Sequence, residues 1–314
     1  MERNETPTKN EGNAMSLLSE ILRIGLQIGK AKKLAARSIY RPQRNTNALH
    51  PSKFDKKLIV ESIAIDGFML LRIQSKKPTH HHLFFLHGGA YVLEPLAAHR
   101  RVVEQLAVEY GFTVHFLLYP LAPEHQFENT YRIVWQAYHK IVQDNPNAAI
   151  HLLGDSAGGG LALAFLQTLS QQNELPMPTK TALVSPWVDI TLANGSIPSY
   201  EKKDPILSIP ALKFAAKSYA GGGDLKNPLL SPMYGPKGNL GELLLLFGTH
   251  ELFYPDLKQL QGELEAAGGT RLDTYIGEKM VHDWIVLPIP EAKIAVNLIA
   301  HWLLKPESID YMSA

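Results

Sequence analysis

Short apolar runs alternate with helix-like stretches from about residue 57 onward. The central runs LFFLH (83–87), FTVHFLLY (112–119) and AIHLLG (149–154) are apolar throughout instead of alternating with polar residues. Continuous apolar runs of this length are typical of strands that are buried on both faces of a sheet. The sequence therefore predicts strands at 58–65, 68–74, 83–87, 112–119, 149–154, 181–186, 243–248 and 272–276.

Segments with helical periodicity separate most of these runs. Alternation of buried strands with helices predicts an α/β fold, with a mostly parallel sheet between two helix layers. The Asp66-Gly67 pair lies between the first two runs and is a hairpin signal, so we expect the sheet to begin antiparallel. Helices are predicted near 97–110, 128–144, 158–172, 255–267 and 289–303.

Two regions depart from this rhythm. Residues 15–40 predict one amphipathic helix, which we expect to pack on the rest of the protein in preference to contacting a membrane surface through its basic end. Residues 192–235 are rich in Pro, Gly and Ser, with one helical stretch at 210–219, and an insertion of this kind favours a cap over a site. We expect three parts. Residues 1–52 form an N-terminal tail and a cap helix, with 1–14 predicted to be disordered. Residues 53–191 and 236–314 form the catalytic core, and 192–235 form the cap insertion.

Composition narrows the classes of function. Lys and Arg number 31 against 30 Asp and Glu, so the balanced charge gives no reason to expect a nucleic-acid partner. The chain contains no cysteine, which excludes disulfides, thiolate metal sites and a Cys nucleophile. The polar N-terminus is wrong for a secretory signal, and no apolar stretch reaches the ~20 residues that span a bilayer. We therefore expect a cytoplasmic protein without a membrane span.

The strongest chemical signal is GDSAGGG at 154–160. It matches G-x-S-x-G between a predicted strand and a predicted helix, which is the context of a nucleophile elbow. The helix that follows Ser156 directs its positive N-terminal dipole toward a developing oxyanion. Gly-rich turns of this kind also bind phosphate, but the segment matches neither G-x-G-x-x-G nor the P-loop pattern.

HGGAYV at 87–92 directly follows a predicted strand. A Gly-Gly pair at a strand end lets backbone N–H groups point into a cleft, where they form an oxyanion hole with the N–H that follows the nucleophile. The predicted donors are Gly88, Gly89 and Ala157.

Together with YPLAPEH (119–125) and SPWVDIT (185–191), these motifs resemble the hormone-sensitive-lipase-like branch of the α/β-hydrolases, which includes many bacterial esterases. The resemblance runs from about residue 80 to 303. It implies an eight-stranded sheet with a helical cap, and hydrolysis of short- or medium-chain acyl esters without a cofactor or a metal. Two positions depart from the family pattern, Ala90 in place of a third glycine and Pro120 in place of an arginine.

The remaining members of a triad follow from chain order and from this resemblance. The base comes last in this fold, and His282 lies in a loop after the final predicted strand, in a motif similar to the family's histidine loop. The acid belongs after the run LLLLFG, where Glu251 and Asp256 compete. Glu251 holds the family's position, three residues after the glycine. Asp256 is better placed to flank the following helix.

Several further residues are weaker candidates. Tyr91 and Trp187 are candidates for substrate binding, although core packing explains them equally well. Asp155 and Asp283 adjoin catalytic residues and are expected to hydrogen-bond their own loops. The run His80-His81-His82 is expected to be an exposed loop before a strand, because adjacent residues cannot all face one metal ion.

The predicted partner is a small-molecule ester, with no nucleic acid, and a homodimer is left open. Two alternatives to an esterase remain. An amidase or deacetylase would use the same triad, and a small-molecule receptor of the same fold would have no catalysis.

Overall fold

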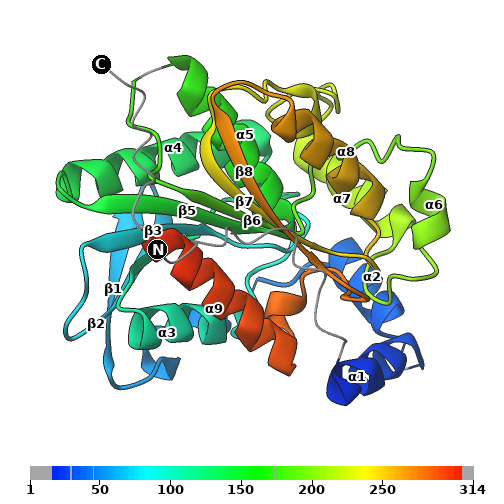
Figure 1. Cartoon of the computed structure of the whole chain (residues 1–314), viewed down its shortest axis with the longest axis horizontal. Helices are drawn as coiled ribbons and strands as arrows, with labels where there is room; N and C mark the ends of the chain where they lie inside the picture. The colour runs from blue at the N-terminus through cyan, green and yellow to red at the C-terminus, as the bar shows by residue number, and fades with distance from the viewer. Residues whose placement is uncertain (1–15, 29, 45, 173, 306–314) are drawn as a thin grey trace, which may run out of the picture.

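A single eight-stranded sheet forms the centre of the protein (Figure 1). The computed structural model describes residues 16–28, 30–44, 46–172 and 174–305. The strands lie side by side in the order β1-β2-β4-β3-β5-β6-β7-β8. Their bounds are β1 Leu58–Ile65, β2 Phe68–Ser75, β3 His81–Leu86, β4 Thr113–Leu118, β5 Ala149–Asp155, β6 Thr181–Val184, β7 Gly241–Gly248 and β8 Thr270–Gly277.

The sheet is antiparallel at one edge and parallel elsewhere, as the sequence predicts. β1 pairs with β2, and β2 with β4, in antiparallel register, and the five remaining pairs from β4 to β8 are parallel. Ile65 faces Phe68 across the Asp66-Gly67 turn. Both turn residues have positive φ, which matches the twist of the flanking strands.

Helices cover both faces of the sheet (Figure 1). Buried residues of α4, α5 and α8 belong to one apolar core, and those of α3 and α9 belong to the core on the opposite face. Burial on both faces explains why the central strands are apolar throughout. These helices are α3 Ala97–Glu109, α4 Phe127–Asp144, α5 Ser156–Gln172, α8 Tyr254–Glu265 and α9 Pro290–Leu304.

The N-terminal region packs against the insertion. α2 contacts α7, and the Tyr40 ring lies 5.1 Å from the Phe214 ring. The prediction of one helix over 15–40 is wrong, because Lys30 adopts a left-handed φ of 60° and separates two helices. The tail 1–14, predicted to be disordered, lies outside the described residues. The helices here are α1 Leu17–Ile28, α2 Ala31–Tyr40, α6 Ile197–Tyr200 and α7 Ile209–Ala220.

Two histidines of the 80–82 run belong to β3, so the prediction of an exposed loop is wrong for them. His81 Nδ1 lies 3.0 Å from His151 Nε2, and His82 Nδ1 lies 2.9 Å from His115 Nε2. Each imidazole therefore finds a hydrogen-bonding partner on a neighbouring strand, which allows polar residues to extend the strand. Over the described ranges, no helix has the length and hydropathy of a bilayer-spanning segment.

Candidate active site

Ser156 lies at the junction of β5 and α5, at the carboxyl end of the parallel strands. Its φ of 50° is in the left-handed region, which a side-chain-bearing residue adopts only when its surroundings enforce it. The turn is tight, because a Cβ on Gly158 would collide with the carbonyl oxygen of Leu86 on β3. The backbone N–H of Trp187 donates to the carbonyl oxygen of Ser156 at 2.8 Å. The elbow is thus held by two neighbouring strand ends.

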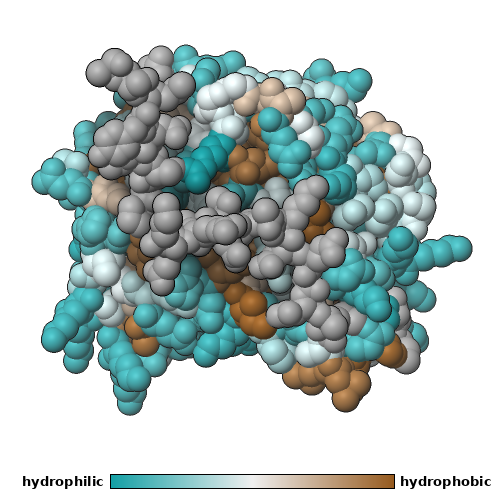
Figure 2. Space-filling view, viewed as in Figure 1, coloured by the Kyte–Doolittle hydropathy of each residue, from teal (hydrophilic) through white to brown (hydrophobic). Residues whose placement is uncertain are grey.

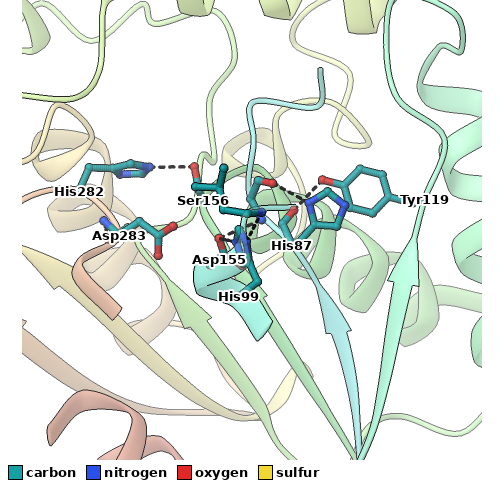
Figure 3. Close-up of polar contacts among 10 residues, drawn as sticks. His87, His99, Tyr119, Asp155, Ser156, His282 and Asp283 are labelled. Atoms are coloured by element: carbon teal, nitrogen blue, oxygen red, sulfur yellow. Dashed lines mark hydrogen bonds and ion pairs between the residues drawn. The ribbon is translucent and has the colours of Figure 1, made fainter. Parts of the chain in front are cut away.

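His282 faces this serine from the loop after β8 (Figure 3). The distance between His282 Nε2 and Ser156 Oγ is 2.8 Å, and both side chains are buried. The histidine loop is joined to the loop after β7, since the His250 N–H donates to the carbonyl oxygen of Met280 at 3.0 Å. This arrangement lets the hydroxyl donate its proton to the imidazole.

Glu251 lies in the loop after β7 and is fully buried. Its Oε2 accepts hydrogen bonds from Ser185 Oγ at 2.7 Å and from the Gly248 N–H at 3.0 Å. Its Oε1 lies 4.0 Å from His282 Nδ1, and neither of these two atoms has a hydrogen-bonding partner within the described part of the chain. One carboxylate oxygen is therefore anchored while the other faces the imidazole, at the loose distance found in unliganded triads.

Asp256, the competing acid, lies in the first turn of α8. Burial raises the pKa of its carboxyl to about 7, and the neighbouring groups that act on it are Asn194 and Asp189. The structure therefore brings Glu251, and not Asp256, to His282.

The N–H groups of the predicted oxyanion loop are not all free. The Gly88 N–H, one of the predicted donors, instead donates to Asp155 Oδ2 at 2.8 Å. The next two residues turn sharply, with φ of 126° at Gly89 and 54° at Ala90, and no acceptor within the described ranges takes either N–H. Ala157 lies in the first turn of α5, where N–H groups have no intrahelical partner. Gly89, Ala90 and Ala157 are thus the free donors near Ser156.

His87, at the start of this loop, is held in place by Tyr119. Its ring stacks on Tyr119 with centroids 4.3 Å apart, and the Tyr119 hydroxyl donates to the His87 carbonyl oxygen at 2.6 Å (Figure 3). Burial, aided by the nearby His99, lowers the pKa of His87 to about 3. The ring is therefore neutral and acts as a packing element.

A buried polar cluster lies beneath the nucleophile (Figure 3). His99, Asp155 and Asp283 each place one polar atom within 4.8 Å of the others, and His99 Nε2 lies 3.2 Å from Asp155 Oδ2. Burial opposes ionisation of Asp155, but His99 holds the pKa of this carboxyl below its usual range. Burial and the charge of Asp155 raise the pKa of Asp283 well above its usual range. Asp283 therefore carries the proton of the carboxyl pair.

Three residues of the site were not identified from the sequence. His99 precedes Asp155 by 56 residues, and no motif signals their contact. Ser185 belongs to SPWVDIT, but its role as a hydrogen-bond donor to Glu251 emerges only from the fold. Asp204 accepts the Leu252 N–H at 2.8 Å and so joins the loop that carries Glu251 to the 192–235 insertion.

The two residues predicted to bind substrate lie inside the protein. The rings of Tyr91 and Tyr219 stack 3.9 Å apart, and Tyr91 also stacks on Trp187 at 5.7 Å. Trp187 donates its indole N–H to the Asp189 carbonyl oxygen at 3.0 Å. Tyr91 and Trp187 are fully buried, so their positions are explained by core packing.

An open cleft of about 910 Å³ lies between the N-terminal helices and the catalytic loops. Leu93 and Leu287, which follow the oxyanion and histidine loops, line it together with Ile206 of the insertion. Leu26 and Leu34 complete its apolar wall from α1 and α2. The cleft thus has a largely apolar lining that includes residues just after the oxyanion and histidine loops.

The chain resembles known hydrolases over most of its length. Residues 83–286 match the family described as "alpha/beta hydrolase fold". An esterase of Acinetobacter venetianus is 34% identical over 228 residues, which cover 70% of this chain and 73% of the relative. An acetyl-hydrolase of Streptomyces hygroscopicus is 30% identical and covers 70% and 74% of the two chains.

Solved structures agree with these relatives. An esterase from the bacterial hormone-sensitive lipase family superposes with a TM-score of 0.78 at 26% identity, covering 92% of this chain and 98% of that one. A hormone-sensitive lipase from a metagenome library superposes with a TM-score of 0.75 at 27% identity, covering 86% and 95%. The chain therefore belongs to the α/β-hydrolase fold family and is an esterase- or lipase-type hydrolase of its hormone-sensitive-lipase-like branch.

Proposed function

We propose that the protein hydrolyses short- to medium-chain carboxylic esters through a Ser156-His282-Glu251 triad and an acyl-enzyme. The observation that carries this proposal is the 2.8 Å contact between Ser156 Oγ and His282 Nε2, with Glu251 on the far side of the imidazole. Nε2 must be free to accept the serine proton, so the ring proton resides on Nδ1, which faces Glu251 Oε1. Glutamate orients the ring and stabilises the imidazolium that forms.

The reaction proceeds in two halves. In the first, Ser156 Oγ attacks the ester carbonyl while His282 accepts its proton. The oxygen that becomes negative is stabilised by the N–H groups of Gly89, Ala90 and Ala157, and each such donor contributes roughly 3–4 kcal/mol elsewhere. The alcohol leaves with the proton held by His282. In the second half, a water molecule gives a proton to His282 and attacks the acyl-serine carbonyl, and His282 returns that proton to Ser156 Oγ as the bond to the acyl group breaks and the acid leaves.

The substrate class is supported by the apolar cleft and by the names of the relatives. A cleft of about 910 Å³ lined by leucines accommodates an acyl chain of several carbons. The Streptomyces hygroscopicus relative is an acetyl-hydrolase, which supports activity on the shortest acyl groups.

The test is hydrolysis of p-nitrophenyl esters from acetate to decanoate by the protein and by Ser156→Ala. We expect turnover of the shorter esters, and a loss on the order of 10⁴-fold or more in kcat when the nucleophile is removed. The matched anilides distinguish an amidase, which would cleave both series. A folded protein that hydrolyses neither series but still binds ligands would be a receptor, and that result would reject the proposal.

A further inference from the structure

Helix α1 presents its apolar side to solvent. Leu17, Leu18, Ile21 and Ile24 are 41–77% exposed. The side that faces the protein carries Ser19, which is buried and donates its hydroxyl to Glu291 of α9. Figure 2 shows the resulting hydrophobic surface at the lower edge of the molecule, where Figure 1 places α1. An apolar helix face turned outward in this way marks an interaction surface.

This surface continues to the mouth of the apolar cleft. Leu34 of α2 is 67% exposed, and Leu96, just before α3, is 56% exposed. Both residues also line the cleft of about 910 Å³ described above. Exposed leucines and isoleucines thus extend from α1 to the rim of this cleft.

Cations lie in and next to the same rim, whose lining also includes Glu94. Lys33, Arg37 and Arg41 are exposed, and none of the three side chains has an ion-pair or hydrogen-bonding partner among the residues that the structure describes. Arg37 follows Leu34 by three residues and so lies on the same side of α2, Arg41 comes directly after the end of the helix, and both line the same cleft. The surface therefore combines an apolar face with positive charge, as in helices that lie in the interface of a membrane.

We propose that this surface, formed by Leu17, Leu18, Ile21, Ile24, Leu34, Leu96, Lys33, Arg37 and Arg41, docks on an anionic lipid surface. The apolar side chains enter the acyl boundary while the cations contact the anionic head groups. The cleft then opens toward the lipid phase, from which an apolar ester can enter without crossing water. Docking is a binding property of this surface and does not depend on the triad.

A second copy of the chain fits this surface less well. A two-fold interface brings the same patch of both copies together, so Arg37 and Arg41 of one copy would approach those of the other. Like charges brought together in this way oppose such contact. Residues 1–15 are also poorly suited to pack on this apolar surface, because they contain few apolar side chains.

The test is cosedimentation of the full chain with phosphatidylcholine vesicles, with and without about 30 mol% of the anionic lipid phosphatidylglycerol. The Ser156→Ala protein is assayed alongside, so that hydrolysis cannot alter the lipid. We expect binding to the anionic vesicles that weakens in high salt. Leu17→Ser/Ile21→Ser should weaken binding by at least about tenfold, because two exposed apolar side chains no longer insert.

Charge and position are tested separately. Arg37→Gln/Arg41→Gln should lower binding to anionic vesicles by about 25-fold, at about fivefold for each cation, and leave binding to neutral vesicles unchanged. Ile294→Ser on α9, which is also exposed, and Lys56→Gln/Lys57→Gln before β1 are the matched controls and should bind as wild type does.

Two results would overturn the proposal. One is failure of the wild type to bind anionic vesicles. The other is a dimer in solution that Leu17→Ser/Ile21→Ser converts to a monomer, because the apolar face would then be an interface between copies. Retained hydrolysis of p-nitrophenyl acetate by the Leu17→Ser/Ile21→Ser variant shows that the variant is folded. A wild type without esterase activity would reject the proposed function but would leave the vesicle-binding result unchanged.

Discussion

Three imidazoles that are buried in the core should make the protein sensitive to acid. His87, His115 and His151 each have a pKa lowered to about 3, with burial as the main cause. The positive charges or imidazoles that face them act in the same direction: His99 beside His87, His82 and Arg72 beside His115, and His81 and Lys180 beside His151. The folded protein therefore keeps these rings neutral at pH values where an unfolded chain protonates them.

The sign and size of the effect follow from this difference. The unfolded chain takes up a proton on each ring near its ordinary pKa of about 6.5, whereas the folded chain does so only near pH 3. Stability is thus fully present above about pH 6.5 and falls as the pH is lowered toward 3. At pH 5 each ring lowers the free energy of unfolding by roughly 2 kcal/mol, because the loss is about 1.4 kcal/mol per pH unit and pH 5 lies about 1.5 units below 6.5. Three rings together cost about 6 kcal/mol, comparable to the total stability of many domains.

His151→Phe tests this reasoning. Phenylalanine retains the ring contacts with His81 and Phe112 but cannot bind a proton. Urea unfolding followed by tryptophan fluorescence at pH 8 and pH 5 measures the free energy of unfolding. The variant should lose about 2 kcal/mol less than wild type between the two pH values. His139→Phe, on the exposed side of α4, should lose as much as wild type does. Equal losses in His151→Phe and wild type would refute the argument.

Three further predictions concern the site. Glu251→Gln should lower kcat for p-nitrophenyl acetate by about 10²–10⁴-fold, whereas Asp256→Asn should change it less than about threefold; the reverse order would transfer the acid role to Asp256. Ser185→Ala removes one of the two hydrogen bonds that anchor the Glu251 carboxylate, so kcat should fall about tenfold, and an unchanged kcat would mean that the other bond suffices. Asp283→Asn keeps a donor toward Asp155 and should retain kcat within about tenfold, while Asp283→Ala should lower both kcat and the unfolding temperature; steady-state kinetics and thermal unfolding separate these outcomes.

The sequence alone determined the layout of the core. Every predicted strand occurs, and the central strands are apolar throughout because they are buried on both faces of a parallel sheet. Ser156 and His282, which the structure brings within 2.8 Å of each other, were predicted as nucleophile and base from local signals, a tight glycine-rich turn and a histidine after the last strand. Such signals are local in the chain, since each reports the backbone geometry or burial of a few consecutive residues.

Contacts between distant segments were decided only by the tertiary structure. The Gly88 N–H is donated to Asp155, which lies 67 residues away, and this contact led us to propose Ala90 in place of Gly88 as an oxyanion donor. The exposed apolar face of α1 has the same periodicity as a face that packs, and only the position of Ser19 against Glu291 shows which side points outward. Periodicity and motifs specify that a helix has an apolar side or that a loop has free N–H groups. Which partner each group meets depends on how segments far apart in the chain pack, and no local pattern encodes that.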